Sequence, residues 1–228
     1  MYTESLKKQE LEKALRQLGW RFLRHGGRHD VWTDRQRQEA IPRHTEINDK
    51  LARAILHSQF AIRNCPPPHR DQRQTGASDS PTGSQEHVSM RFAGRIYKDD
   101  KFWLAEIPIL DAMTQGRTRK EAFAMVADLL ETLVDRPGLT VHVHPGEDDH
   151  FEVSASDMRP LVSLLLRRQR ERSGLSLADA AARLGAKSRN AYARYERGTS
   201  LPTVEKLDAL LHAVSPDRDF VLHPSTVE

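Results

Sequence analysis

The sequence predicts an α+β chain made of several small domains. Its 228 residues exceed the usual size of one small domain, and only 38% of them are hydrophobic, so each core must be small. Apolar residues also change their spacing along the chain, from helical to alternating and back again, before a final stretch that is helical throughout. These observations predict four parts, which are residues 1–60, 61–89, 90–157 and 158–228.

Charge is unevenly distributed among these parts. Residues 1–64 hold 13 basic and 8 acidic side chains (net +5), residues 90–158 hold 8 and 13 (net −5), and residues 159–228 hold 12 and 8 (net +4). Basic segments suit nucleic-acid backbones, whereas an acidic segment is repelled by them and could instead cover a basic neighbour.

Cysteine usage and hydropathy indicate the compartment. Cys65 is the only cysteine, which excludes an internal disulfide and a cysteine-rich zinc site and fits a reducing cytoplasm. No apolar run is long enough to span a bilayer, and Lys7, Lys8 and Glu10 interrupt any signal-peptide core. We therefore expect a cytoplasmic protein without a membrane partner.

The first part has the element order helix, strand, strand, strand, helix. Leucines at helical spacing predict a helix over Thr3–Leu18 that ends at Gly19. Strands are expected at Trp20–Phe22, His29–Thr33 and Glu39–Pro42. Gly26-Gly27 predicts a turn between the first two strands that tolerates positive φ. Thr45 is the expected N-cap of a second helix, whose apolar face contains Ile47, Leu51, Ala54 and Ile55.

The next part changes in character. Residues 61–89 begin with prolines and continue with polar residues, so they predict a disordered linker. Met90 opens the following segment and could serve as a separate start. Alternation then predicts a hairpin around Lys98-Asp99-Asp100, a third strand at Ala112–Gln115, a helix through Ala122–Leu133, and two strands at Leu139–His144 and His150–Ser154.

From Pro160 onward the pattern is helical. Ser176-Leu177-Ala178-Asp179 forms a capping box for a helix that ends at Gly185. Ser188 is the expected cap of the next helix, Arg189–Arg197, which stops at Gly198. Pro202-Thr203 begins the last helix. The apolar positions of these helices predict one small all-α domain.

Several short motifs of the first part occur in a fixed order: Gly19-Trp20, Gly26-Gly27-Arg28-His29-Asp30, Trp32, Ile41–Ile47 and Leu51-Ala52-Arg53. In this order and spacing they resemble the HicA family of toxins, over about residues 8–58. The resemblance implies a domain like those that bind double-stranded RNA (dsRBD-like) and a ribonuclease that cleaves mRNA and stops growth. It also implies that His29 is the catalytic residue.

The residues themselves are compatible with that chemistry. RNA carries its own nucleophile, the 2′-hydroxyl, and a histidine can take up that proton near neutral pH. Arg24, Arg28 and Arg43 could bind phosphate and stabilise the charged transition state. No acidic cluster indicates a metal, so we expect cleavage without metal or cofactor. Of the other histidines nearby, His44 is expected to be a loop residue and His25 to be solvated.

The acidic third part resembles the HicB antitoxin. The resemblance is carried by the hairpin Phe92–Ile107 and by Gln115-Gly116-Arg117-Thr118, which leads into Lys120-Glu121-Ala122. The proline-glycine-cysteine turn of that family is replaced by Pro108-Ile109-Leu110-Asp111. The resemblance implies a partial ribonuclease-H-like α/β domain that binds the toxin and covers its active site. Two other readings are less favoured, namely a nuclease site at Asp99, Asp100, Glu106 and Asp111 and a metal site at His142 and His144.

The last part, with Tyr195-Glu196-Arg197-Gly198-Thr199 and Pro202, resembles the Cro/repressor (XRE-type) helix-turn-helix. The resemblance implies a third helix in the DNA major groove, with Arg189 and Asn190 at base edges and with Lys187, Ser188 and Arg194 at phosphates or bases. Tyr195 and Ala191 are expected to pack inward. Arg167, Arg168 and Arg170 are expected to form a solvated face. Such domains usually bind palindromic operators as homodimers, and a higher homo-oligomer is also possible.

These resemblances predict a type II toxin–antitoxin fusion. Its mRNA-cleaving toxin would be neutralised by the antitoxin part of the same or a neighbouring chain, and its helix-turn-helix would repress its own operon. Two alternatives remain open. One is a sequence-specific transcriptional regulator whose N-terminal domain only binds RNA without cleaving it. The other is a nonspecific double-stranded-RNA-binding protein with an appended DNA-binding domain.

Overall fold

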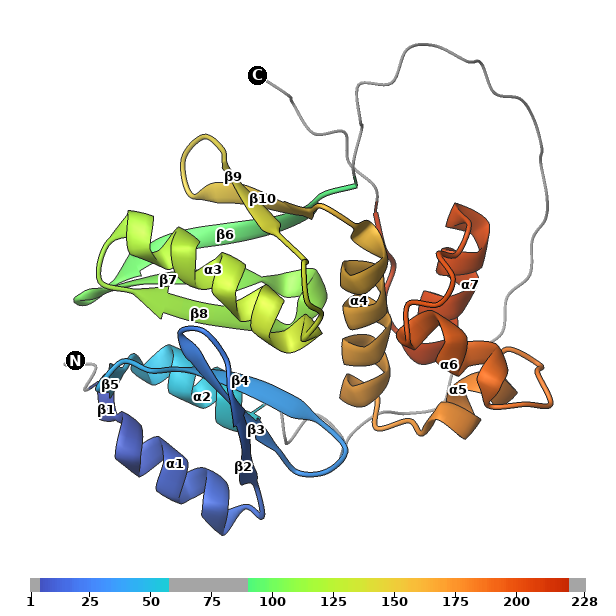
Figure 1. Ribbon diagram of the computed structural model, residues 1–228, viewed down its shortest axis with the longest axis horizontal. Coiled ribbons are helices and arrows are strands. Elements are labelled where there is room, and N and C mark those ends of the chain that lie inside the picture. Colours follow the sequence, from blue (N-terminus) through green and yellow to red (C-terminus); the bar gives the residue numbers. More distant parts are fainter. Residues whose placement is uncertain (1–4, 58–89, 222–228) are drawn as a thin grey trace.

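The computed structural model describes residues 5–57 and 90–221, and the predicted linker at 61–89 lies outside them. The described residues form an N-terminal unit (5–57), a middle unit (90–157) and a C-terminal unit (158–221). Figure 1 shows the first two units together on one side of a single helix and the remaining C-terminal helices on its other side. The prediction of mixed helix and sheet content is therefore confirmed.

The N-terminal unit has the predicted order with two short strands added. Its elements are β1 (Leu6–Lys7), α1 (Lys8–Gln17), β2 (Arg21–His25), β3 (His29–Thr33), β4 (Gln38–Pro42), β5 (Glu46–Ile47) and α2 (Asp49–His57). Strands β2, β3 and β4 form an antiparallel sheet in that order, and β1 pairs with β5. Leu11, Leu15, Trp32, Ile41 and Leu51 fill the core beneath the sheet.

The short pair of strands corrects two predicted boundaries. Leu6 and Lys7 pair with Ile47 and Glu46, so the first helix starts at Lys8 rather than near Thr3. The same pairing keeps Ile47 out of the second helix. The prediction of Thr45 as its N-cap is therefore wrong, and the side chain of Asn48 instead accepts a hydrogen bond from the Lys50 N–H at 2.8 Å.

The middle unit is a five-stranded antiparallel sheet in the order β8-β7-β6-β10-β9. Its elements are β6 (Phe92–Asp99), β7 (Phe102–Ile107), the short 3₁₀ helix η1 (Pro108–Leu110), β8 (Ala112–Gly116), α3 (Arg119–Val134), β9 (Val141–Pro145) and β10 (His150–Ala155). The predicted hairpin, third strand, helix and final strand pair are all present. Helix α3 lies across this sheet (Figure 1), and the Thr118 side chain caps it by accepting from the Glu121 N–H.

The C-terminal unit is helical, as predicted. It contains α4 (Met158–Arg172), α5 (Leu177–Arg183), α6 (Asn190–Glu196) and α7 (Val204–Val214). The capping box is present, because Ser176 and Asp179 each accept a hydrogen bond from the other's backbone N–H. Gly185 and Gly198 take positive φ just beyond α5 and α6, where a left-handed residue ends a helix at low cost. No helix in the described ranges is long and apolar enough to cross a membrane.

Helix α4 belongs to two interfaces at once. Its apolar side chains share one core with the middle unit and with Tyr192 and Tyr195 of α6. On its other side, Arg168 makes a bidentate ion pair with Glu39 of β4, at 2.6 and 3.0 Å, and is only 5% exposed. Arg170 pairs with Glu196, and Arg167 donates to the Leu133 carbonyl. The expected solvated face is therefore wrong, because neighbouring units cover α4 from both sides.

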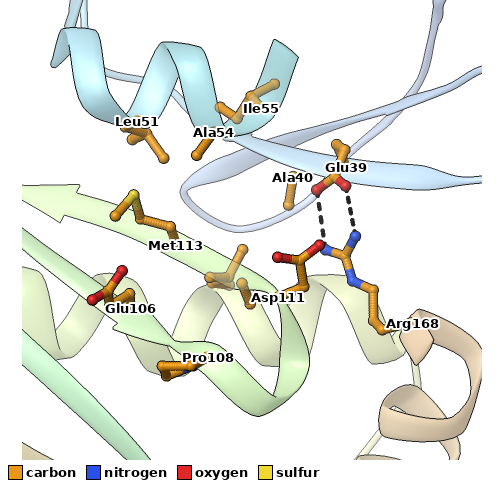
Figure 2. A pocket seen from close by; sticks show the side chains of 12 residues that line it. Glu39, Ala40, Leu51, Ala54, Ile55, Glu106, Pro108, Asp111, Met113 and Arg168 are labelled. Atoms are coloured by element: carbon orange, nitrogen blue, oxygen red, sulfur yellow. Dashed lines mark hydrogen bonds and ion pairs between the residues drawn. The ribbon is translucent and has the colours of Figure 1, made fainter. Parts of the chain in front are cut away.

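A cavity of about 110 Å³ lies where the three units meet. Figure 2 shows residues of β4 and α2 on one side of it and residues of the middle unit on the other, with the Glu39–Arg168 pair at one end. Burial alone would lower the pKa of Arg168, but the neighbouring carboxylate of Glu39 raises it above its ordinary value. This arginine is therefore charged in the folded chain.

Glu39→Ala is expected to destabilise the chain by about 3–5 kcal/mol, because it leaves the charge of Arg168 buried without a partner. Chemical unfolding followed by circular dichroism measures this loss. The double variant Glu39→Leu/Arg168→Met, which removes both charges and retains side-chain volume, should recover most of the stability. A double variant as unstable as Glu39→Ala would contradict this account.

Candidate functional site

His29, the predicted catalytic residue, lies on β3 with 0% of its surface exposed. Its Nδ1 is 2.6 Å from a carboxylate oxygen of Asp128 on α3. Its Nε2 is 2.9 Å from the hydroxyl of Thr114 on β8. Both partners belong to the middle unit, which therefore binds both ring nitrogens of this buried histidine.

The partners determine the protonation of the imidazole. An ionised carboxylate can only accept hydrogen bonds, so Nδ1 carries the proton and donates a hydrogen bond to Asp128. The Thr114 hydroxyl then donates a hydrogen bond to Nε2. Burial lowers the pKa of His29 below its ordinary value, although Asp128 acts in the opposite direction. Burial would raise the pKa of Asp128, but hydrogen bonds from His29 and the Arg28 N–H outweigh burial and lower it. The pair is therefore a neutral imidazole bound to a carboxylate.

The turn before His29 allows helix α3 to approach closely. A Cβ on Gly27 would lie 2.0 Å from Asp128 Oδ1, and a Cβ on Gly26 would lie 2.5 Å from the Thr132 hydroxyl oxygen. The predicted turn is present, but neither glycine has positive φ, so the turn does not use the conformation that glycine tolerates. The two glycines instead provide space. The Arg28 N–H uses this approach to donate to both carboxylate oxygens of Asp128, at 2.8 Å each.

The three arginines predicted to bind RNA surround this turn. Arg24 donates to the Thr132 carbonyl at 2.7 Å and pairs with Asp135 at 3.2 Å, so it also contacts the middle unit. Arg43 bonds to Asp30 and to the Gly26 carbonyl within its own unit. The backbone of Arg28 contacts Asp128, and its residue surface is exposed. The structure thus brings the predicted cluster together, and part of it is occupied by the middle unit.

A second group of contacts lies around His44. This imidazole is 3.1 Å from both Glu121 and the side-chain nitrogen of Gln115. Gln115 is fully buried, accepts from the Asn48 N–H at 2.7 Å and donates to the Glu46 carbonyl at 2.8 Å. His44 is therefore an interface residue rather than a simple loop residue. His25 is largely exposed, as expected, and bonds to Asp30.

The acidic residues weighed as a nuclease site are spread among other partners. Asp99 binds Lys50 at 2.6 Å and the Asn48 side chain at 2.7 Å, which joins the middle unit to α2. Glu106 pairs with Arg95 across the hairpin. Within residues 5–57 and 90–221, no three His, Cys, Asp or Glu side chains converge in a group that could hold a metal ion.

Sequence reasoning did not identify the middle-unit partners of this site, among them Thr114, Gln115 and Asp128. One signal for Asp128 was available. Apolar residues occur around much of the circumference of α3, from Ala122 to Leu133, which predicts contacts on more than one side. Asp128 and Thr132 are polar residues one turn apart on the side that faces the N-terminal unit, and this spacing places them together.

The predicted DNA-binding residues lie together on the C-terminal unit. Five residues are exposed in the turn before α6 and on the helix itself: Lys187, Ser188, Arg189, Asn190 and Arg194. The Ser188 hydroxyl accepts from the Asn190 N–H at 3.3 Å, but Arg189 rather than Ser188 occupies the N-cap position of α6, and it makes no side-chain cap. Tyr192 and Tyr195 are buried against α4, and the Tyr192 hydroxyl donates to the Leu166 carbonyl. The opposite face of α6 is thus left open to solvent.

Acidification is expected to weaken the closed structure through His29. Because burial lowers its pKa in the folded chain, the unfolded chain binds the proton first as pH falls below about 6.5, and stability then decreases by up to about 1.4 kcal/mol per pH unit. Thermal unfolding of the wild type and of His29→Gln between pH 8 and 5 measures this effect. The wild type should lose more stability than the variant, and parallel curves would contradict the assignment.

Comparison with known families supports two of the three units. Residues 9–59 match the family model of the HicA toxin of bacterial toxin–antitoxin systems, and residues 166–214 match a helix-turn-helix model. Together the matches cover less than half of the chain, and neither extends over the middle unit. No curated protein matches the chain. The chain therefore joins a segment similar to the HicA toxin to a segment similar to a helix-turn-helix.

Proposed function

We propose that the chain is a self-neutralised ribonuclease toxin that also binds operator DNA. In this proposal the N-terminal unit cleaves mRNA through His29, the middle unit acts as a HicB-like antitoxin, and the C-terminal unit represses the chain's own operon. One observation carries the proposal. The histidine that the family resemblance marks as catalytic is fully buried, and both of its ring nitrogens are bound by the middle unit.

The proposed reaction uses the nucleophile of the RNA itself. When the middle unit moves away, Nε2 of His29 accepts the proton of a 2′-hydroxyl, and the resulting oxyanion attacks the adjacent phosphorus. The bond from phosphorus to the 5′-oxygen breaks and that oxygen takes up a proton from water, which leaves a 2′,3′-cyclic phosphate and a 5′-hydroxyl end. Arg24, Arg28 and Arg43 are placed to stabilise the added negative charge. In the closed chain the Thr114 hydroxyl already donates to Nε2, the contact that the 2′-hydroxyl would make.

The contacts support neutralisation within one chain. Besides His29, the middle unit occupies Arg24 through Thr132 and Asp135, and it occupies the Arg28 N–H through Asp128. All these partners lie on α3 or immediately after it. A substrate phosphate cannot approach His29 while α3 is in place.

The arrangement also supports DNA binding by the closed chain. The exposed face of α6 carries the predicted base-reading residues Arg189 and Asn190. It lies on the side of α4 away from the N-terminal unit (Figure 1). Covering His29 therefore leaves this face free, which is what repression by a neutralised toxin requires.

Asp128→Arg in the full chain tests the toxin. The substitution replaces an acceptor by a cation beside the Arg28 N–H and the His29 ring, so α3 should be displaced and His29 exposed. We expect growth arrest on expression, and RNA fragments with 5′-hydroxyl ends from the purified variant. Asp128→Arg/His29→Ala should do neither.

Asp149→Arg is the matched control, because it makes the same charge change at an exposed loop position of the middle unit. It should be harmless. Limited proteolysis reports whether Asp128→Arg has opened the chain. An opened Asp128→Arg chain that neither cleaves RNA nor arrests growth would favour the alternative of a transcriptional regulator with an inactive N-terminal domain.

Arg189→Ala and Asn190→Ala test the DNA-binding face. Each should weaken binding to the chain's own promoter fragment by about 1–3 kcal/mol, because a side chain that reads a base edge is lost. Gel-shift titration at fixed salt measures the change, with the exposed Lys120→Ala on α3 as a charge-matched control. Unchanged affinity in the first two variants would remove these residues from the interface.

A further inference from the structure

We infer that the turn Gly27-Arg28-His29 is a binding site for a phosphate group of RNA, and that the carboxylate of Asp128 fills this site in the closed chain. The inference rests on the proposed function for the identity of its ligand. The proposed phosphate site is a second subsite, separate from the bond that reacts. It has its own hydrogen-bond donors, and the carboxylate of Asp128 blocks it.

The donors of the turn converge on one anion. The Arg28 N–H donates to both oxygens of Asp128 at 2.8 Å each, and His29 Nδ1 donates to one of them at 2.6 Å. A backbone N–H and an imidazole N–H directed at a single group favour a ligand with several acceptor oxygens and a negative charge. The carboxylate has these properties, and so do the non-bridging oxygens of a phosphodiester.

Gly27 supplies the space for this anion. A Cβ at this position would lie 2.0 Å from Asp128 Oδ1, inside the volume that the bound oxygen occupies. The backbone of Gly27 is not in the left-handed region, so its conformation does not itself require glycine. The missing side chain is therefore explained by the approach of the anion.

Nearby charges also favour an anion. Arg24, Arg43 and the exposed Arg28 lie around the turn and leave it electropositive. One carboxylate, Asp30, follows His29 directly. Burial would raise its pKa, but hydrogen bonds from Lys8, His25 and Arg43 lower the pKa to about 2, and the cations Lys8 and Arg43 compensate its charge. The turn can therefore accept a second anion.

The directions of the two ring nitrogens of His29 indicate which phosphate of the RNA backbone would bind at this turn. The two ring nitrogens point in diverging directions, with Asp128 bound at one and the Thr114 hydroxyl at the other. A reacting 2′-hydroxyl must be placed at Nε2 to transfer its proton. The phosphate held at Nδ1 is then a neighbouring one along the RNA backbone. Binding it would set the register of the RNA and keep Nδ1 protonated.

The test uses the full chain with Asp128→Ala, which empties the site and removes the carboxylate contacts that hold α3 against the turn. The probes are inorganic phosphate and a 2′-O-methyl oligoribonucleotide, which cannot be cleaved because it lacks the nucleophile. NMR signals of the Arg28 amide and the His29 ring should shift in a saturable way in this variant and not in the wild type. The oligonucleotide should bind more tightly than phosphate, because it also meets the arginines.

Two further variants make the result specific to the turn. Asp128→Ala/Gly27→Ala should bind phosphate at least tenfold more weakly, because the added methyl group occupies the anion position. Asp135→Ala removes a carboxylate that pairs with Arg24 but does not empty the turn, so it should not create a site. If Asp128→Ala fails to fold or remains closed to the probe, the same titration is made on the opened Asp128→Arg chain.

The outcomes separate this inference from the proposed function. Equal phosphate affinity with and without the Gly27 methyl group, or binding of inorganic phosphate that the oligonucleotide does not displace, would overturn the RNA-phosphate site. RNA cleavage by Asp128→Arg together with absent binding at the turn would also overturn it while leaving the ribonuclease in place. Specific binding at the turn without cleavage would support the subsite and refute the ribonuclease.

Discussion

The contact of His29 with Asp128 and Thr114 determines how the N-terminal and middle units meet. A buried imidazole needs a partner at each nitrogen, because an unsatisfied polar group in a core is costly. Meeting that need places α3 against the glycine turn and β8 beneath the ring. Neutralisation in this proposal is therefore a matter of fit and hydrogen bonding. The exposed ion pairs at the edges, such as Arg24–Asp135, would add little by comparison.

Charge and geometry play different parts in this arrangement. The opposite net charges of residues 1–64 and 90–158 suggest which units attract each other, and several contacts do join a basic N-terminal residue to an acidic middle one. Net charge does not determine which residues meet. Gln115 shows this, because an uncharged and fully buried side chain makes three hydrogen bonds to the N-terminal unit.

Much of the fold was predictable, because local signals define it. Helical leucine spacing, the hairpin signal at Lys98-Asp99-Asp100 and the capping box at Ser176 all act over a few residues. The first helix, the hairpin and the capping box are present, although Lys98 and Asp99 belong to β6 and the turn itself is at residues 100 and 101. His29 was singled out by a family resemblance rather than by its own chemistry. Asp128 and Arg168 were not predicted in their roles, since their partners lie 99 and 129 positions away in sequence. No periodicity in a window of ten or twenty residues carries that information.

Helix α4 has an evolutionary consequence, because it is both the first helix of the DNA-binding unit and the surface on which β4 rests. A surface helix tolerates many substitutions, but Arg168 is buried against Glu39 on one side of α4 while Ser163 donates to the Tyr195 carbonyl on the other. Substitution of either Glu39 or Arg168 alone leaves the charge of the other residue buried without a partner. Among related chains that retain all three units, positions 39 and 168 should therefore covary, and a chain that has lost its N-terminal unit should lose the arginine as well.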